Sequence, residues 1–130
     1  MPIETEFRTN GVILWHSGVI TGQEVIETND AIYKHQYEGR LLFQLADLSD
    51  VEEFNVSSND MKHIADMDRL YKEAIHNIQY CCVVAPSDAL YARSRQWNIQ
   101  AQEDDFHTNV VRSMDKAIAW FKSKGITVSI

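Results

Sequence analysis

The chain has 130 residues, of which 45% are hydrophobic and 24% charged, as in one globular domain that can bury a core without disulfides. Twelve basic and nineteen acidic residues give a formal net charge of -7. The basic residues are scattered, so we expect no binding to nucleic acid. No apolar run is long enough to span a membrane, and MPIETEFRTN does not have the apolar segment of a signal peptide. We therefore predict a single cytoplasmic domain over residues 1–130.

The two cysteines, Cys81 and Cys82, are adjacent in a predicted strand. Neighbouring side chains of a strand point to opposite faces, so these two cannot form a disulfide with each other. The pattern predicts two free thiols, buried and unreactive, in a reducing compartment.

The first predicted element is a β-hairpin of Ile3–Arg8 and Val12–Ser17, joined by Thr9-Asn10-Gly11. Asn-Gly favours a type I′ turn because both residues tolerate positive φ.

A helix is predicted next, from about Gly22 to His35. Thr21 and Glu24 have the spacing of a capping box at its start, and Gly39 ends the segment. The residues predicted on its inner face are Val25, Thr28 and Ile32.

The central strand is predicted over about Arg40 to Leu48, where an almost unbroken apolar run indicates burial on both faces. We interpret Asp47 to Glu53 as an acidic loop. Ser57-Ser-Asn-Asp60 has the spacing of a second capping box, and a helix follows to about Asn77. Its inner face is predicted to hold Met61, Ile64, Ala65, Tyr71, Ala74 and Ile75.

In the last part of the chain, the pattern of apolar residues predicts strands at Ile78–Val84 and Phe106–Val111. Ser87 caps a helix between them, and Ser113 caps a final helix that ends at Gly125. The inner face of the helix after Ser87 is predicted to hold Leu90, Ser94, Trp97 and Ala101. Ile126–Ile130 is open to two readings, an edge strand or a loosely packed end.

The resulting order, ββαβαβαβα, predicts an α/β domain: a mixed, mostly parallel five-stranded sheet with an N-terminal hairpin and four helices. Open sheets of this kind place ligand and partner sites beyond the carboxyl ends of their strands. Ser57, Ser58, Ser87, Asp88 and Tyr91 are therefore the candidate binding surface.

Three stretches resemble the SpoIIAA-like family, which includes the STAS domains of anti-sigma-factor antagonists and, more distantly, the lipid-binding CRAL-TRIO domains. They are Arg40-Leu-Leu-Phe43, Tyr80-Cys-Cys-Val-Val-Ala-Pro86, and Val110-Val111 followed by Asp115-Lys-Ala-Ile-Ala-Trp-Phe121. The small, stand-alone bacterial members are the most similar. The resemblance implies a SpoIIAA-like fold, a homodimer and a protein partner.

STAS antagonists carry a phosphorylated serine in an Asp-Ser-Ser/Thr-Gly motif before their second helix. The corresponding stretch here places Val56 at the aspartate and Asn59 at the glycine, but keeps Ser57 and Ser58. Two roles stay open for these serines. A phosphate there would be stabilised by the helix N-terminus, whereas a serine in that place is also an ordinary helix cap.

No pattern of an enzyme or of a cofactor site is present in the sequence. The five histidines form no close pair, the acidic segment does not have the spacing of an EF-hand, and no glycine-rich phosphate loop occurs. We predict no metal, no cofactor and no catalysis. The resemblance, together with this lack, implies two alternative functions: a binding or regulatory module acting through Ser57, Ser58 and Ser87, or, as in the CRAL-TRIO relatives, a carrier of a small apolar or lipid-like ligand.

Overall fold

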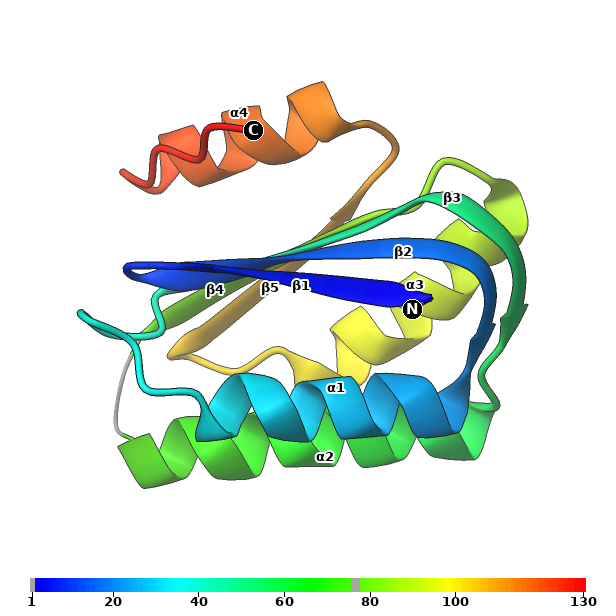
Figure 1. Cartoon of the computed structure of the whole chain (residues 1–130), viewed down its shortest axis with the longest axis horizontal. Coiled ribbons are helices and arrows are strands. Elements are labelled where there is room, and N and C mark those ends of the chain that lie inside the picture. The colour runs from blue at the N-terminus through cyan, green and yellow to red at the C-terminus, as the bar shows by residue number, and fades with distance from the viewer. Residues whose placement is uncertain (1, 76–77) are drawn as a thin grey trace.

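The computed structural model describes residues 2–75 and 78–130. It shows an α/β domain with a five-stranded sheet and four helices, as the sequence predicts (Figure 1). The elements run in the order β1 (Ile3–Arg8), β2 (Gly11–Thr21), α1 (Gly22–Lys34), β3 (Phe43–Asn55), α2 (Ser58–Ile75), β4 (Gln79–Val84), α3 (Asp88–Ala101), β5 (Phe106–Val111) and α4 (Met114–Ser123).

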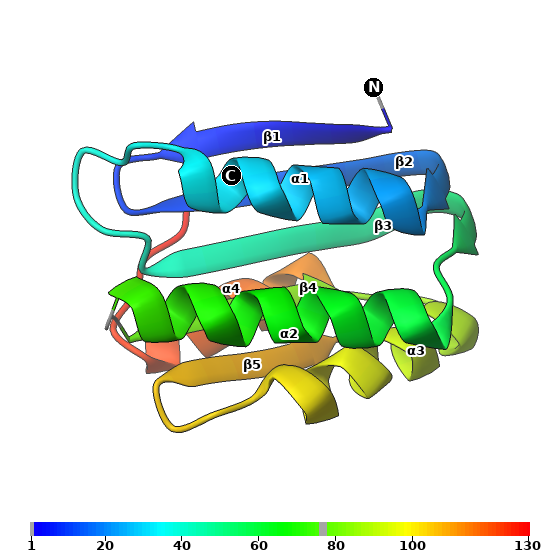
Figure 2. The ribbon, with the colours of Figure 1, turned by 90° about the horizontal axis from the view of Figure 1, so that it is seen from below.

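The strands follow one another across the sheet in chain order, β1-β2-β3-β4-β5. β1 and β2 are antiparallel, and every other pair is parallel. Parallel neighbours need crossover connections, which are almost always right-handed. Because the order never reverses, the connecting helices α1, α2 and α3 all lie on one face, and α4 covers the other (Figures 1 and 2).

The two faces of the sheet carry two separate apolar clusters. In β3, Phe43 and Leu45 point toward α4, whereas Leu48 points toward α1–α3, as the alternation of a strand requires. The central strand is therefore covered on both sides, as predicted, although it begins at Phe43 and not at about Arg40. Cys81 and Cys82 divide between the two faces in the same way, and both are free and buried.

The N-terminal hairpin is confirmed, but the proposed role of Gly11 is wrong. Gly11 pairs with Arg8 as the first residue of β2, and the glycines with positive φ are Gly18 and Gly125. A Cβ on Gly11 would lie 2.3 Å from Cδ1 of Phe43. Close approach to the neighbouring strand, and not a left-handed turn, therefore explains the glycine.

The predicted helix starts are confirmed. Thr21 and Glu24 form a reciprocal capping box, and Ser57 and Asp60 form another, with both hydrogen bonds of the second pair at 3.0 Å. Ser87 accepts from the amide of Leu90, and Ser113 caps α4 in the same manner. The predicted end of α2 near Asn77 lies outside the described residues.

The acidic segment Asp47 to Glu53 is not a loop. β3 continues through it to Asn55, paired in parallel with β2. The register shifts twice, between Trp15 and Ser17 and between Gly18 and Val19, and each shift places an extra residue in β3. These bulges space the inward side chains Leu48, Val51 and Phe54 three residues apart, which hides the period of two that identifies a strand.

The end of the chain forms no strand, and it is not loosely packed. Ile126 and Val128 are buried in the cluster beneath α4, together with Ile13 and Phe43. Within residues 2–75 and 78–130, no helix is both long and apolar enough to cross a membrane.

Candidate functional site

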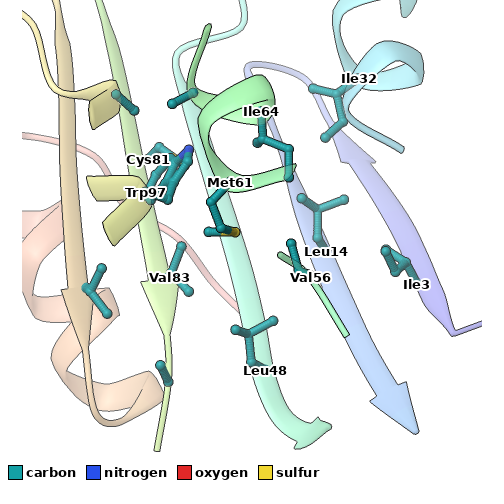
Figure 3. Packing of buried hydrophobic residues seen from close by; sticks show 14 of the residues in the cluster. Ile3, Leu14, Ile32, Leu48, Val56, Met61, Ile64, Cys81, Val83 and Trp97 are labelled. Atoms are coloured by element: carbon teal, nitrogen blue, oxygen red, sulfur yellow. The ribbon is translucent and has the colours of Figure 1, made fainter. Parts of the chain in front are cut away.

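An inner cavity of about 90 Å³ lies between the sheet and helices α1–α3. Its walls are mainly apolar: Met61 and Ile64 project from α2 toward the sheet, and Leu14, Leu48 and Val83 come from three strands (Figure 3). The polar side chains that line it are His16, Asn29, Gln44, Asp68 and Ser94. A mainly apolar cavity with a few convergent polar groups is the usual form of a small-molecule site.

Asp68 of α2 connects three helices at the polar end of this cavity, and its side chain is fully buried. Its Oδ1 accepts hydrogen bonds from the Tyr33 hydroxyl at 2.7 Å and from Asn29 Nδ2 at 3.1 Å, both in α1. Its Oδ2 accepts from Trp97 Nε1 of α3 at 2.9 Å. Among the described residues, none of its hydrogen-bond donors is cationic.

Burial dominates the ionisation of this group. Loss of hydration raises the pKa of Asp68, and the hydrogen bonds from Tyr33, Trp97 and Asn29 oppose that rise. The pKa of Tyr33 lies well above its ordinary value, first because of burial and then because of the Asp68 charge. A buried carboxyl with a perturbed pKa in a cavity marks a candidate functional residue.

The polar network continues from Tyr33 into the sheet. Gln44 Nε2 of β3 lies 3.1 Å from the Tyr33 hydroxyl and 3.3 Å from Oε1 of Gln79. Gln79 is completely buried at the start of β4, and its own Nε2 has no hydrogen-bond partner among the described residues.

His16 lines the inner cavity from β2, and only 7% of its surface is exposed. Its Nδ1 lies 3.3 Å from the carbonyl oxygen of Leu14. Burial lowers the pKa of His16, although hydrogen bonds to the backbone of Leu14 and Asp47 partly offset this effect. The imidazole is therefore a neutral wall of the cavity near pH 7.

A second, outer hollow of about 340 Å³ lies among the end of β3 and the start of α3. Its lining includes Ser87, Leu90, Arg93 and Phe54. Phe54 also lines the inner cavity, so the two spaces adjoin at this residue.

The candidate surface residues predicted from the sequence lie at the carboxyl end of the sheet, in two groups. Arg93 Nη1 donates to Ser58 Oγ at 3.3 Å, which joins the start of α2 to α3. Asp88 instead pairs with Arg112 at 2.9 Å, and the Arg112 guanidinium lies 4.1 Å from the centre of the Tyr91 ring. Ser57 is engaged as a helix cap, and Ser87 is both a cap and part of the outer hollow.

Neither a thiol site nor a metal site emerges from the described residues. Burial raises the pKa of Cys82 to about 12 and the pKa of Cys81 well above its ordinary value. Residues 2–75 and 78–130 contain no group of three His, Cys, Asp or Glu side chains arranged to hold a metal ion.

No family model, curated protein or solved structure matches this chain. The resemblance to SpoIIAA-like domains therefore stays a prediction from the sequence, while the architecture rests on the structure itself.

The sequence interpretation missed the inner cavity and Asp68, although a signal was present. Asp68 falls on the apolar stripe of α2, four residues after Ile64 and seven after Met61. Asn29 similarly lies between Val25 and Ile32 on the buried face of α1. Polar residues at core positions of an amphipathic helix indicate either a buried network or a site.

Proposed function

We propose that the protein binds a small, largely apolar ligand in the inner cavity between the sheet and α1–α3. The observation that carries this proposal is the joint presence of apolar walls and a buried, hydrogen-bonded carboxylate in one space. At about 90 Å³ the cavity is smaller than the sites of drug-sized molecules, which occupy roughly 300 to 1,000 Å³. A ligand of a few carbon atoms with one polar group fits its size.

Phe54 is the proposed barrier between the inner cavity and the outer hollow, because it lines both. Movement of its ring would open a passage between the two spaces, and the rate of ligand exchange through that passage depends on this movement. The outer hollow lies beside Ser87 and Arg93, so this passage would lead to the carboxyl end of the sheet.

The test is a titration with straight-chain alcohols of three to six carbons, followed by the methyl resonances of Leu14, Leu48 and Val83. We expect saturable shifts of these methyl groups. Ala46→Leu, which fills the cavity from β3, should abolish them. Ala119→Leu is the matched control, because Ala119 is exposed on α4 across the sheet.

A Phe54→Ala variant should bind the same alcohols with faster exchange, since the barrier is removed. If no alcohol shifts any cavity methyl group of the natural sequence, the ligand-binding proposal is wrong. Equal shifts in the Ala46→Leu variant would also contradict it, because binding would then lie elsewhere.

A regulatory surface around Ser58 is the second candidate function. Arg93 contacts the Ser58 hydroxyl, and Arg93 forms no ion pair with a carboxylate in the described part of the chain. A phosphate on Ser58 would lie beside this guanidinium and at the start of α2. Ser57 is the less favourable acceptor, because its hydroxyl already caps the helix.

Intact-mass analysis after incubation with ATP and a native lysate tests this second function. We expect one added phosphate, mapped to Ser58 and lost in Ser58→Ala. A phosphate mapped to Ser57 would contradict the preference derived from the cap. Absence of phosphate, together with no protein that binds the natural sequence but not Arg93→Gln, would exclude the regulatory surface.

A further inference from the structure

The hydrogen-bonding capacity of Asp68 is not used up by its protein partners. An ionised carboxylate accepts about four hydrogen bonds, two at each oxygen. Among the described residues, Oδ1 accepts two, from Tyr33 and Asn29, whereas Oδ2 accepts one, from Trp97. Asp68 lines the inner cavity, so one acceptor position is left at Oδ2 for a donor placed there.

The charged side chains that line the cavity are of one sign, negative. Among the described residues that line the cavity, Asp68 is the only acid, and none is a lysine or arginine. A buried carboxylate without a cation is costly, because its hydration is lost and no opposite charge replaces it. A ligand that brings a positive charge would remove that cost, whereas a carboxylate or phosphate head group would add a second negative charge.

The remaining walls determine the other half of the ligand. Leu14, Leu48, Met61, Ile64 and Val83 offer carbon and sulfur surfaces and no charge. These side chains suit a short hydrocarbon body. The polar end and the apolar walls together define a molecule with one cationic group and a hydrocarbon tail.

We propose that the ligand of the inner cavity is a small aliphatic amine, whose ammonium group donates a hydrogen bond to Oδ2 of Asp68. A hydrogen bond between two charged groups is roughly twice as strong as a neutral one. The amine therefore binds more tightly than an alcohol of the same length. An acid of that length does not bind, because its negative charge is repelled by Asp68. This inference rests on the proposed ligand-binding function and specifies its chemical class.

The experiment compares 1-butylamine, 1-butanol and butyrate at pH 7 and 150 mM salt, with the indole N–H of Trp97 as the reporter in ¹H–¹⁵N spectra. Trp97 donates to Asp68, so its resonance responds to changes at that carboxylate. We expect butylamine to bind at least tenfold more tightly than butanol, and butyrate not to bind. If butanol binds as tightly as butylamine or more tightly, the amine assignment is wrong but the ligand-binding function still holds.

If none of the three compounds shifts Trp97 or the cavity methyl groups, both proposals fail together. Asp68→Asn replaces the carboxylate by an amide of the same size and should reduce the amine-to-alcohol ratio to about one. Asp50→Asn is its control, because Asp50 is an exposed acid of β3. A ratio that survives in Asp68→Asn would overturn the assignment.

Ala46→Leu keeps Asp68 and the acidic surface but fills the cavity, and it should lose the amine signal. An amine signal that persists in this variant would show binding to the surface of an acidic protein and would overturn the proposal. Because Ala46 is not one of the hydrogen-bond partners of Asp68, this comparison stands even where Asp68→Asn fails to fold.

Discussion

The Tyr33 hydroxyl donates a 2.7 Å hydrogen bond to Asp68 Oδ1, across a separation of 35 residues in the sequence. Asn29 and Trp97 complete the set of donors, so one carboxylate holds α1, α2 and α3 together. The same group forms the polar end of the inner cavity. Stability and ligand recognition are therefore linked at this residue.

Replacing Asp68 by alanine should lower the free energy of unfolding by about 3 kcal/mol or more, because three buried donors lose their acceptor. Urea denaturation followed by circular dichroism measures the change. Asp50→Ala, at an exposed position of β3, should change stability by less than about 0.5 kcal/mol. A loss below about 1 kcal/mol for Asp68→Ala would show that the network contributes little.

The stability contributed by Asp68 should decrease as pH rises. The pKa of this carboxyl is raised in the folded state, so above the ordinary aspartate pKa the folded protein keeps a proton that the unfolded chain has released. The contribution is complete below the unfolded pKa and is lost as pH rises through the folded pKa. Urea unfolding of the natural sequence and of Asp68→Asn from pH 3 upward isolates this difference. A difference that grows with pH would mean that the three hydrogen bonds outweigh burial.

Both cysteines should be unreactive in the folded protein. The thiolate is the reactive form, and burial raises the pKa of Cys82 to about 12 and that of Cys81 well above its ordinary value. A thiol reagent at pH 8 should modify neither residue until urea is added, and both afterwards. Rapid modification of either cysteine without denaturant would show that the sheet opens locally.

Ser57→Ala should destabilise the protein by about 1 kcal/mol, because it removes the cap of α2 and half of the reciprocal pair with Asp60. Ser58→Ala is the matched control, since the Ser58 hydroxyl is exposed and its bonds to Arg93 and Gln96 are long, at 3.3 and 3.5 Å. Thermal and urea unfolding of the two variants give the comparison. Equal losses would contradict the assignment of Ser57 as the cap.

The sequence predicts elements well where local chemistry decides them. The capping serines and Thr21 act on amides within three residues, so their spacing alone identifies the helix starts. The second half of β3 depends instead on distant pairing with β2. Its charged side chains and two bulges conceal a strand that exists because β2 lies beside it.

The residues of the candidate site likewise differ in whether local spacing or distant packing determines their place. Ser87 can be predicted from the sequence, because a helix cap acts on an amide only three residues away. Asp68, Tyr33 and Trp97 come from three different helices, and only their packing on the sheet brings them together. The sequence did contain one usable signal, the carboxylate on the apolar stripe of α2.

The apolar cluster beneath α4 shares strands with the cavity face but none of its side chains. α4 is a ten-residue helix that packs on its own apolar cluster, on the face of the sheet opposite α1–α3 (Figure 1). It can therefore detach as a separate cooperative unit while α1–α3 stay assembled. In native-state hydrogen exchange, a cavity ligand would then slow the amides of α1–α3 and leave those of α4 unchanged.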